Sequence, residues 1–198
     1  MSRLKNFINR FSWDARAAKR AYNLPVYPVK EVYIHHSVTG SSKEESTWRN
    51  IQTYHMVQQR NWTDIAYNFG VGQSGKIFEG RGWRRQGGAT GAKKDRHSLS
   101  ICAIGNFEKI KPTQKMLDAI VHWIQIGIER GSIVPDVKIL AHKDVQPTLC
   151  CGKHLYAKLD YIRDALAAPK EVPKVDNKLS NLKEAQLLIN SVIKELEA

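Results

Sequence analysis

The sequence predicts an α/β fold in which a mixed central β-sheet is flanked by helices, with a further helix at the C-terminus. Short apolar runs of strand length alternate with longer segments whose apolar residues recur every three to four positions. The 198 residues are 42% hydrophobic, enough to bury a substantial core. Such an alternation is typical of helices packed on a sheet.

The first half of the predicted domain contains a strand, a helix and a hairpin. An apolar run predicts a strand over 31–36, and helical spacing predicts a helix over 46–60. Strands at 67–71 and 76–79 flank the turn residues Gln73-Ser74-Gly75, which is typical of a hairpin.

The second half continues the alternation. Thr113 is a suitable N-cap for the clearest helix, and Gly131 ends it. The predicted elements are a strand, a helix, a strand and a helix, at 98–104, 113–130, 137–141 and 155–167.

The composition changes near residue 168. Residues 1–168 form the predicted domain, and 169–178, with two prolines, form a predicted linker. Apolar residues at three-to-four spacing predict an amphipathic helix over 179–198. We expect this helix to dock on the domain, to self-associate with another copy, or to assist the domain in binding its partner.

The net charge is +12, which indicates a polyanionic partner such as a nucleic acid, an anionic membrane or an anionic cell-wall polymer. No basic and aromatic module of recognised spacing occurs, so we expect no nucleic acid. The sequence contains no apolar run long enough for a transmembrane segment and no recognisable signal peptide. Three cysteines, two of them adjacent, indicate a reducing compartment rather than a disulfide framework.

Three residues have the chemistry of a zinc site. His35 ends an apolar strand, and His142 lies eight residues before Cys150 across a loop that contains proline. Two imidazoles and one thiolate leave the fourth position of a tetrahedral zinc open, as in catalytic sites. His36 and Cys151 are adjacent alternatives, and a lone histidine is more often structural than a ligand.

Six sequence blocks resemble the peptidoglycan recognition proteins, which are related to bacteriophage amidase-type lysozymes and bacterial amidases. They occur in the family's order, and the similarity runs from about residue 9 to about residue 167. The blocks are 13–19, 34–39, 64–69, 80–83, 105–107 and 142–150.

The resemblance implies a zinc-dependent N-acetylmuramoyl-L-alanine amidase, with 1–168 as its catalytic domain. Such an enzyme hydrolyses the amide between N-acetylmuramic acid and L-alanine in peptidoglycan. His35, His142 and Cys150 match the ligands of one zinc ion. Tyr67 matches the catalytic tyrosine, and Thr148 matches a position whose side chain lies near the metal or stabilises the loop.

Four further residues are expected to bind substrate. Gly82 and Trp83 resemble the pair that recognition proteins use for stems with meso-diaminopimelate, which favours a sugar-stacking role for Trp83 over its alternative as a core residue. Arg81 is expected to pair with stem carboxylates, because guanidinium groups suit carboxylates. His36 is expected to contact substrate beside the ligand His35.

The retained ligands and Tyr67 favour a bacteriolytic enzyme over a non-catalytic recognition protein, which is the alternative. The protein is expected to be a phage endolysin, which is located in the host cytoplasm before its release to the cell wall. A secreted recognition protein is the second possibility, and its family members usually carry a signal and disulfides. The expected partners are peptidoglycan and anionic wall polymers.

Overall fold

The structure is a computed structural model that describes residues 6–58, 61–168 and Gln186. The chain divides into two units, residues 1–166 and 167–198, and the first unit is described below. The predicted linker and C-terminal helix lie outside the described residues, apart from Gln186, which is helical. Within the described ranges, no helix combines the length and the apolar character needed to cross a membrane.

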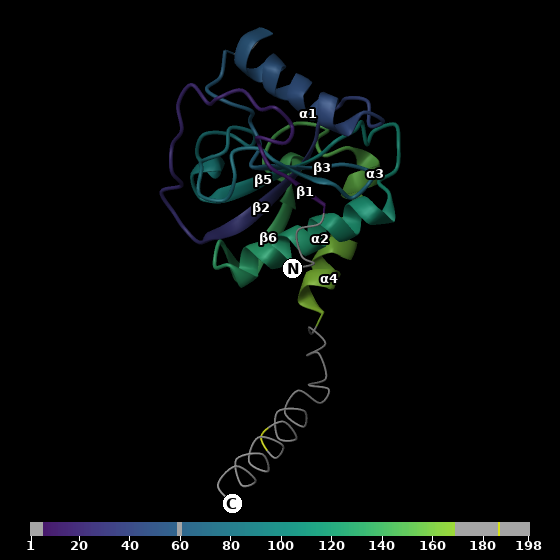
Figure 1. Cartoon of the computed structure of the whole chain (residues 1–198). Helices are drawn as coiled ribbons and strands as arrows, with labels where there is room; N and C mark the ends of the chain where they lie inside the picture. Colours follow the sequence, from purple (N-terminus) through teal and green to yellow (C-terminus); the bar gives the residue numbers. More distant parts are fainter. Residues whose placement is uncertain (1–5, 59–60, 169–185, 187–198) are drawn as a thin grey trace, which may run out of the picture. The chain divides into compact units, whose positions relative to one another are not determined.

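A six-stranded sheet with the order β1-β4-β3-β5-β2-β6 forms the centre of the first unit (Figure 1). Only β3 and β4 pair antiparallel, and the other neighbours are parallel, so the predicted mixed sheet is confirmed. The strands are β1 (Phe7–Ile8), β2 (Val29–His36), β3 (Phe69–Val71), β4 (Ile77–Glu79), β5 (Ser98–Ala103) and β6 (Ile133–Ala141).

The helices include the ones that the sequence predicts, with changed bounds. Thr113 caps α2 as expected, because its Oγ1 accepts a hydrogen bond from the Met116 amide at 3.2 Å. The first predicted helix continues into a π-helix, and the last one is divided in two. The helices are α1 (Glu44–Thr53), the π-helix (Tyr54–Gln58), α2 (Gln114–Glu129), α3 (Lys153–Tyr156) and α4 (Leu159–Ala167), with 3₁₀ turns at Lys94–Arg96 and His142–Asp144.

Two apolar clusters cover the two faces of the sheet, one under α1 and one under α2 (Figure 1). Successive strand residues point to opposite faces, so Ile34 packs in the α2-side cluster and His35 faces the α1 side. Cys102 pairs with His35 in the parallel register and belongs to the α1-side cluster, together with Trp48.

The parallel pairing determines where the predicted ligands emerge. β2 lies between β5 and β6 and is parallel to both strands. The carboxyl ends of these strands therefore meet at one edge of the sheet. His35 is the second-last residue of β2, and His142 directly follows β6, so both histidines reach this edge.

Candidate metal centre

His35, His142 and Cys150 converge at this edge of the sheet. Their ligand atoms all lie within 4.8 Å of one another. The Cys150 Sγ is 3.6 Å from the His35 Nδ1, and the ring centroids of His35 and His142 are 4.8 Å apart. The structure thus brings together the three residues that the sequence singles out as ligands.

The loop that carries Cys150 is fixed by its own hydrogen bonds. The Cys150 amide donates to the Thr148 Oγ1 at 3.2 Å, and the Cys150 carbonyl accepts from the Lys143 amide at 2.7 Å. The His36 amide donates to the Cys150 Sγ at 3.4 Å. The Thr148 hydroxyl is thus one of the acceptors within this loop.

The donor set fits a zinc ion. Burial, with His142 nearby, lowers the pKa of His35 well below its ordinary value, and burial also lowers the pKa of His142. Both imidazoles are therefore neutral at pH 7, which is the form that binds metals. Burial raises the pKa of the Cys150 thiol to about 11, so zinc binding would have to release that proton.

The adjacent candidates His36 and Cys151 point elsewhere. His36 faces the opposite side of the sheet from His35, where its Nδ1 accepts a hydrogen bond from the Phe107 amide at 3.3 Å. Cys151 is buried in the α2-side cluster. Among the described residues, the potential metal cluster consists of His35, His142 and Cys150. The expected substrate contact of His36 finds no support in its placement.

Tyr67 lies beside the three ligands. Its ring centroid is 5.5 Å from that of His35 and 5.8 Å from that of His55, and it stacks on Trp48 at 6.1 Å. Burial, with Cys102 and Cys150 nearby, raises the pKa of Tyr67 well above 10. The phenol therefore keeps its proton at neutral pH and can donate a hydrogen bond to a developing oxyanion.

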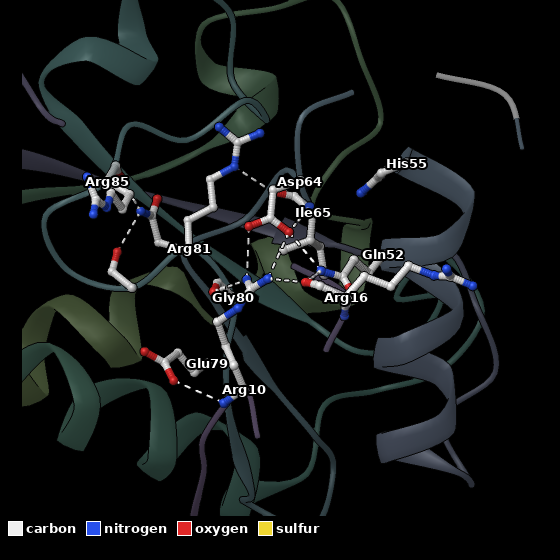
Figure 2. Close-up of polar contacts among 12 residues, drawn as sticks. Arg10, Arg16, Gln52, His55, Asp64, Ile65, Glu79, Gly80, Arg81 and Arg85 are labelled. Atoms are coloured by element: carbon white, nitrogen blue, oxygen red, sulfur yellow. Dashed lines mark hydrogen bonds and ion pairs between the residues drawn. The ribbon is translucent and has the colours of Figure 1, made fainter. Parts of the chain in front are cut away.

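A polar network anchors the segment that leads to Tyr67 (Figure 2). The buried Asp64 carboxylate accepts from the Arg10 guanidinium at 2.9 and 3.2 Å and from the Gln52 Nε2 at 2.8 Å. The Ala66 amide donates to the His55 Nδ1 at 3.2 Å. The N-terminal segment, α1 and the approach to Tyr67 are thereby connected.

Arg81 lies next to this network, and its guanidinium is hydrogen-bonded to backbone carbonyls (Figure 2). Its Nε donates to the Ile65 carbonyl at 2.6 Å, and its Nη1 donates to the carbonyls of Gln86 and Gly87 at 2.8 and 3.2 Å. Its amide donates to the Tyr67 carbonyl at 3.0 Å. The guanidinium therefore supports the backbone around Tyr67, instead of the expected pairing with stem carboxylates.

Gly82 and Trp83 also lie away from the ligands. The Trp83 ring centroid is 4.5 Å from Phe69 and 5.1 Å from Trp123 of α2, so Trp83 packs on the α2 side of the sheet. This is the opposite face from His35, and in this position Trp83 packs against the α2-side cluster, as expected for its core alternative. Gly82 is buried at φ +78°, where its carbonyl accepts from the Asn68 Nδ2 at 2.9 Å.

A hollow of about 540 Å³ adjoins Tyr67. Its wall consists of the loop after β2, α1 and the following π-helix. Apart from Ser37 and Thr39, which lie in the block 34–39, motif matching does not single out these residues, because hydroxyls and amides on a loop and a helix form no distinctive pattern. They include Ser37, Thr39, Thr47, Asn50, Tyr54 and His55.

Replacing Asp64 with alanine should lower the free energy of unfolding by about 3 kcal/mol, because the change removes the buried carboxylate that accepts from Arg10 and Gln52. Urea unfolding would measure the loss. The matched control is Glu45→Ala, which removes an exposed ion pair with Lys76 and should cost about 0.5 kcal/mol. Equal losses in the two variants would contradict an anchoring role for Asp64.

Comparison with known proteins places this geometry in a family. Residues 25–153 match the family described as N-acetylmuramoyl-L-alanine amidase. The peptidoglycan recognition protein of Trichoplusia ni is 38% identical over 156 residues, which cover 77% of this chain and 84% of that protein. Peptidoglycan recognition protein 1 of Mus musculus is 33% identical over 153 residues, with coverage of 75% and 83%.

Solved structures agree with the sequence relatives. Drosophila PGRP-LB superposes with a TM-score of 0.72 at 34% identity, covering 78% of this chain and 92% of that one. Peptidoglycan recognition protein-LE in complex with tracheal cytotoxin gives a TM-score of 0.75 at 36% identity, with coverage of 80% and 94%. The chain therefore belongs to the N-acetylmuramoyl-L-alanine amidase family, which it shares with the peptidoglycan recognition proteins.

Proposed function

We propose that this protein is a zinc-dependent amidase that hydrolyses the bond between N-acetylmuramic acid and L-alanine in bacterial peptidoglycan. The observation that carries the proposal is the convergence of His35, His142 and Cys150, with the Tyr67 ring 5.5 Å from that of His35. All four residues lie inside the matched range 25–153. Two imidazoles and one thiolate are a donor set that leaves a position open for chemistry.

The chain's own residues have separate tasks in this reaction. A zinc ion held by the three ligands would polarise the scissile carbonyl and activate water. Tyr67 would donate its phenolic proton in a hydrogen bond to the carbonyl oxygen as negative charge develops there. Trp48 stacks on the Tyr67 ring, and Arg81 holds the Tyr67 carbonyl, so the donor is oriented before substrate binds.

The hollow beside Tyr67 suits a peptide stem. Its hydroxyl and amide side chains, among them Thr39, Thr47 and Asn50, can pair with the carbonyl and amide groups of an extended peptide. A related structure, peptidoglycan recognition protein-LE, is described in complex with a monomeric diaminopimelic acid-type peptidoglycan. We assign the same class of substrate to this chain, and its charge of +12 favours anionic wall polymers as additional partners.

The second candidate function is recognition of peptidoglycan without hydrolysis, because the similar proteins are named recognition proteins. The retained ligands and Tyr67 favour the enzyme.

For its setting we propose a phage endolysin that stays in the host cytoplasm until lysis, a proposal supported by the three free cysteines. Export of the protein by intact host cells would contradict this setting.

The test of the proposed function is digestion of purified peptidoglycan, followed by mass spectrometry of the soluble products. The zinc-loaded protein should release peptide stems with a free L-alanine amino terminus and leave the lactyl group on the sugar. The same protein treated with a chelator should release neither product. Binding of peptidoglycan without release in both samples would instead support a recognition protein.

A further inference from the structure

The two ring nitrogens of His35 face different partners. The Nδ1 lies 3.6 Å from the Cys150 Sγ, on the side of the ligand cluster. The Nε2 lies 3.1 Å from the Thr90 Oγ1, although the two residues are 55 positions apart in the sequence. Both side chains are buried, at 1% exposure each. His35 therefore meets Thr90 in an enclosed site, where water does not replace a lost hydrogen bond.

This geometry determines which nitrogen must carry the proton. A neutral imidazole has one N–H and one lone pair, and a metal needs the lone pair. Because the Nδ1 faces the ligand cluster, the proton belongs on the Nε2, from which it can be donated to the Thr90 hydroxyl. That hydroxyl lies 3.3 Å from the Ser100 Oγ and can donate a hydrogen bond to it. Ser100 is buried at 1% exposure.

The loop around Thr90 is held by one carboxylate. The Asp95 Oδ1 accepts from the amides of Ala89 and Thr90 at 3.2 and 3.1 Å, and the Oδ2 accepts from the Gly91 amide at 3.0 Å. Asp95 itself is buried. Three amides that converge on one carboxylate fix the backbone at Thr90, so its hydroxyl is pre-positioned against His35.

We propose that Thr90 is a positioning residue that locks His35 in the Nε2–H tautomer and in the ring orientation required for zinc binding. Ser100 holds the Thr90 hydroxyl in place through the hydrogen bond between their Oγ atoms. The inference depends on the metal site of the proposed function, and it adds the outer partner that a metal-binding histidine requires. A neutral hydroxyl takes the place that a carboxylate or a backbone carbonyl often has in such sites.

The first test measures zinc affinity by competition with a chromophoric chelator. Thr90→Val keeps the shape of the side chain but removes the acceptor, and it should weaken zinc binding by about 10- to 100-fold. Thr90→Ser keeps the hydroxyl and should restore most of the affinity. The matched control is Thr53→Val, because the Thr53 hydroxyl donates to the Arg49 carbonyl in α1. This control should bind zinc like the wild type.

The second test uses the metal-free protein and nuclear magnetic resonance of ¹⁵N-labelled histidine. The wild type should show His35 in the Nε2–H tautomer, and Thr90→Val should show a mixture of the two tautomers. Ser100→Ala, a smaller change, should shift the populations in the same direction and supplies a second variant if Thr90→Val does not fold.

The outcomes separate this inference from the proposed function. Failure of the wild type to bind zinc would refute the zinc amidase, and the tautomer of His35 would still decide the role of Thr90. Wild-type zinc binding together with unchanged affinity in Thr90→Val would overturn the inference and leave the amidase standing. An Nδ1–H tautomer in the wild type would overturn it as well.

Discussion

Cys150→Ser should remove bound zinc and lower the rate of peptide release on the order of a thousandfold or more. Bound to zinc, Cys150 would be the one anionic ligand of the cluster, and a serine hydroxyl is a much weaker ligand, because it gives up its proton to a metal far less readily than a thiol does. A metal contributes several kcal/mol to stabilising the transition state, and each 1.36 kcal/mol corresponds to a tenfold change in rate. Elemental analysis and the peptidoglycan digest would measure the two effects.

The neighbouring cysteine is the matched control for this variant. Cys151 packs in the α2-side cluster, so Cys151→Ala should keep its zinc and its activity and lose a modest amount of stability. This pair of variants also tests the ligand assignment. Zinc retained in Cys150→Ser and lost in Cys151→Ala would show that Cys151 is the ligand.

The sequence predicts the sheet and the ligand edge well because both depend on local patterns. Apolar runs identify β2, β5 and the second half of β6, and the parallel arrangement then brings the residues after β6 close to those at the end of β2. His35 and His142 occupy these places. The two-residue strand β1 and the first half of β6 are missed, because a very short strand and a segment that contains Pro135 lack the usual alternation.

The sequence predicts poorly where side chains outside helices and strands point. Arg81 and Trp83 have the chemistry of binding residues, but their direction depends on the irregular chain between β4 and β5. Arg81 instead donates to backbone carbonyls, and Trp83 stacks on Trp123 on the opposite side of the sheet from His35. A motif records the residue type and not the face toward which it points.

Thr90 illustrates the opposite error, since nothing near it in the sequence indicates a role at the metal centre. Its contact with His35 exists only because β2 and β5 are neighbours, and because Asp95 turns the preceding loop toward them. A single neutral hydroxyl has no distinctive spacing. Such outer partners become visible only when the tertiary structure is known.

Tyr67→Phe should lower kcat by about 100-fold or more, with the zinc content and KM close to those of the wild type. The change removes only the hydroxyl, a donor that acts on charge present in the transition state, and the ring can still stack on Trp48. Steady-state release of L-alanine stems would give kcat and KM separately. The matched control is Tyr161→Phe, which removes a hydroxyl that donates to Asp118 on the exposed surface and should leave both constants unchanged.

The pH dependence of the two proteins adds a test that loss of structure would not mimic. Burial raises the pKa of Tyr67 well above 10, so the protonated donor persists through neutral pH and is lost only as the pH rises through that higher value. The ratio of the wild-type kcat to the kcat of Tyr67→Phe should therefore stay constant from pH 6 to pH 9. This range lies on the order of one unit or more below the ordinary tyrosine pKa of about 10. A kcat ratio that declines within this range would mean that Tyr67 ionises there. Equal kcat values in the two proteins would mean that Tyr67 does not act as the donor.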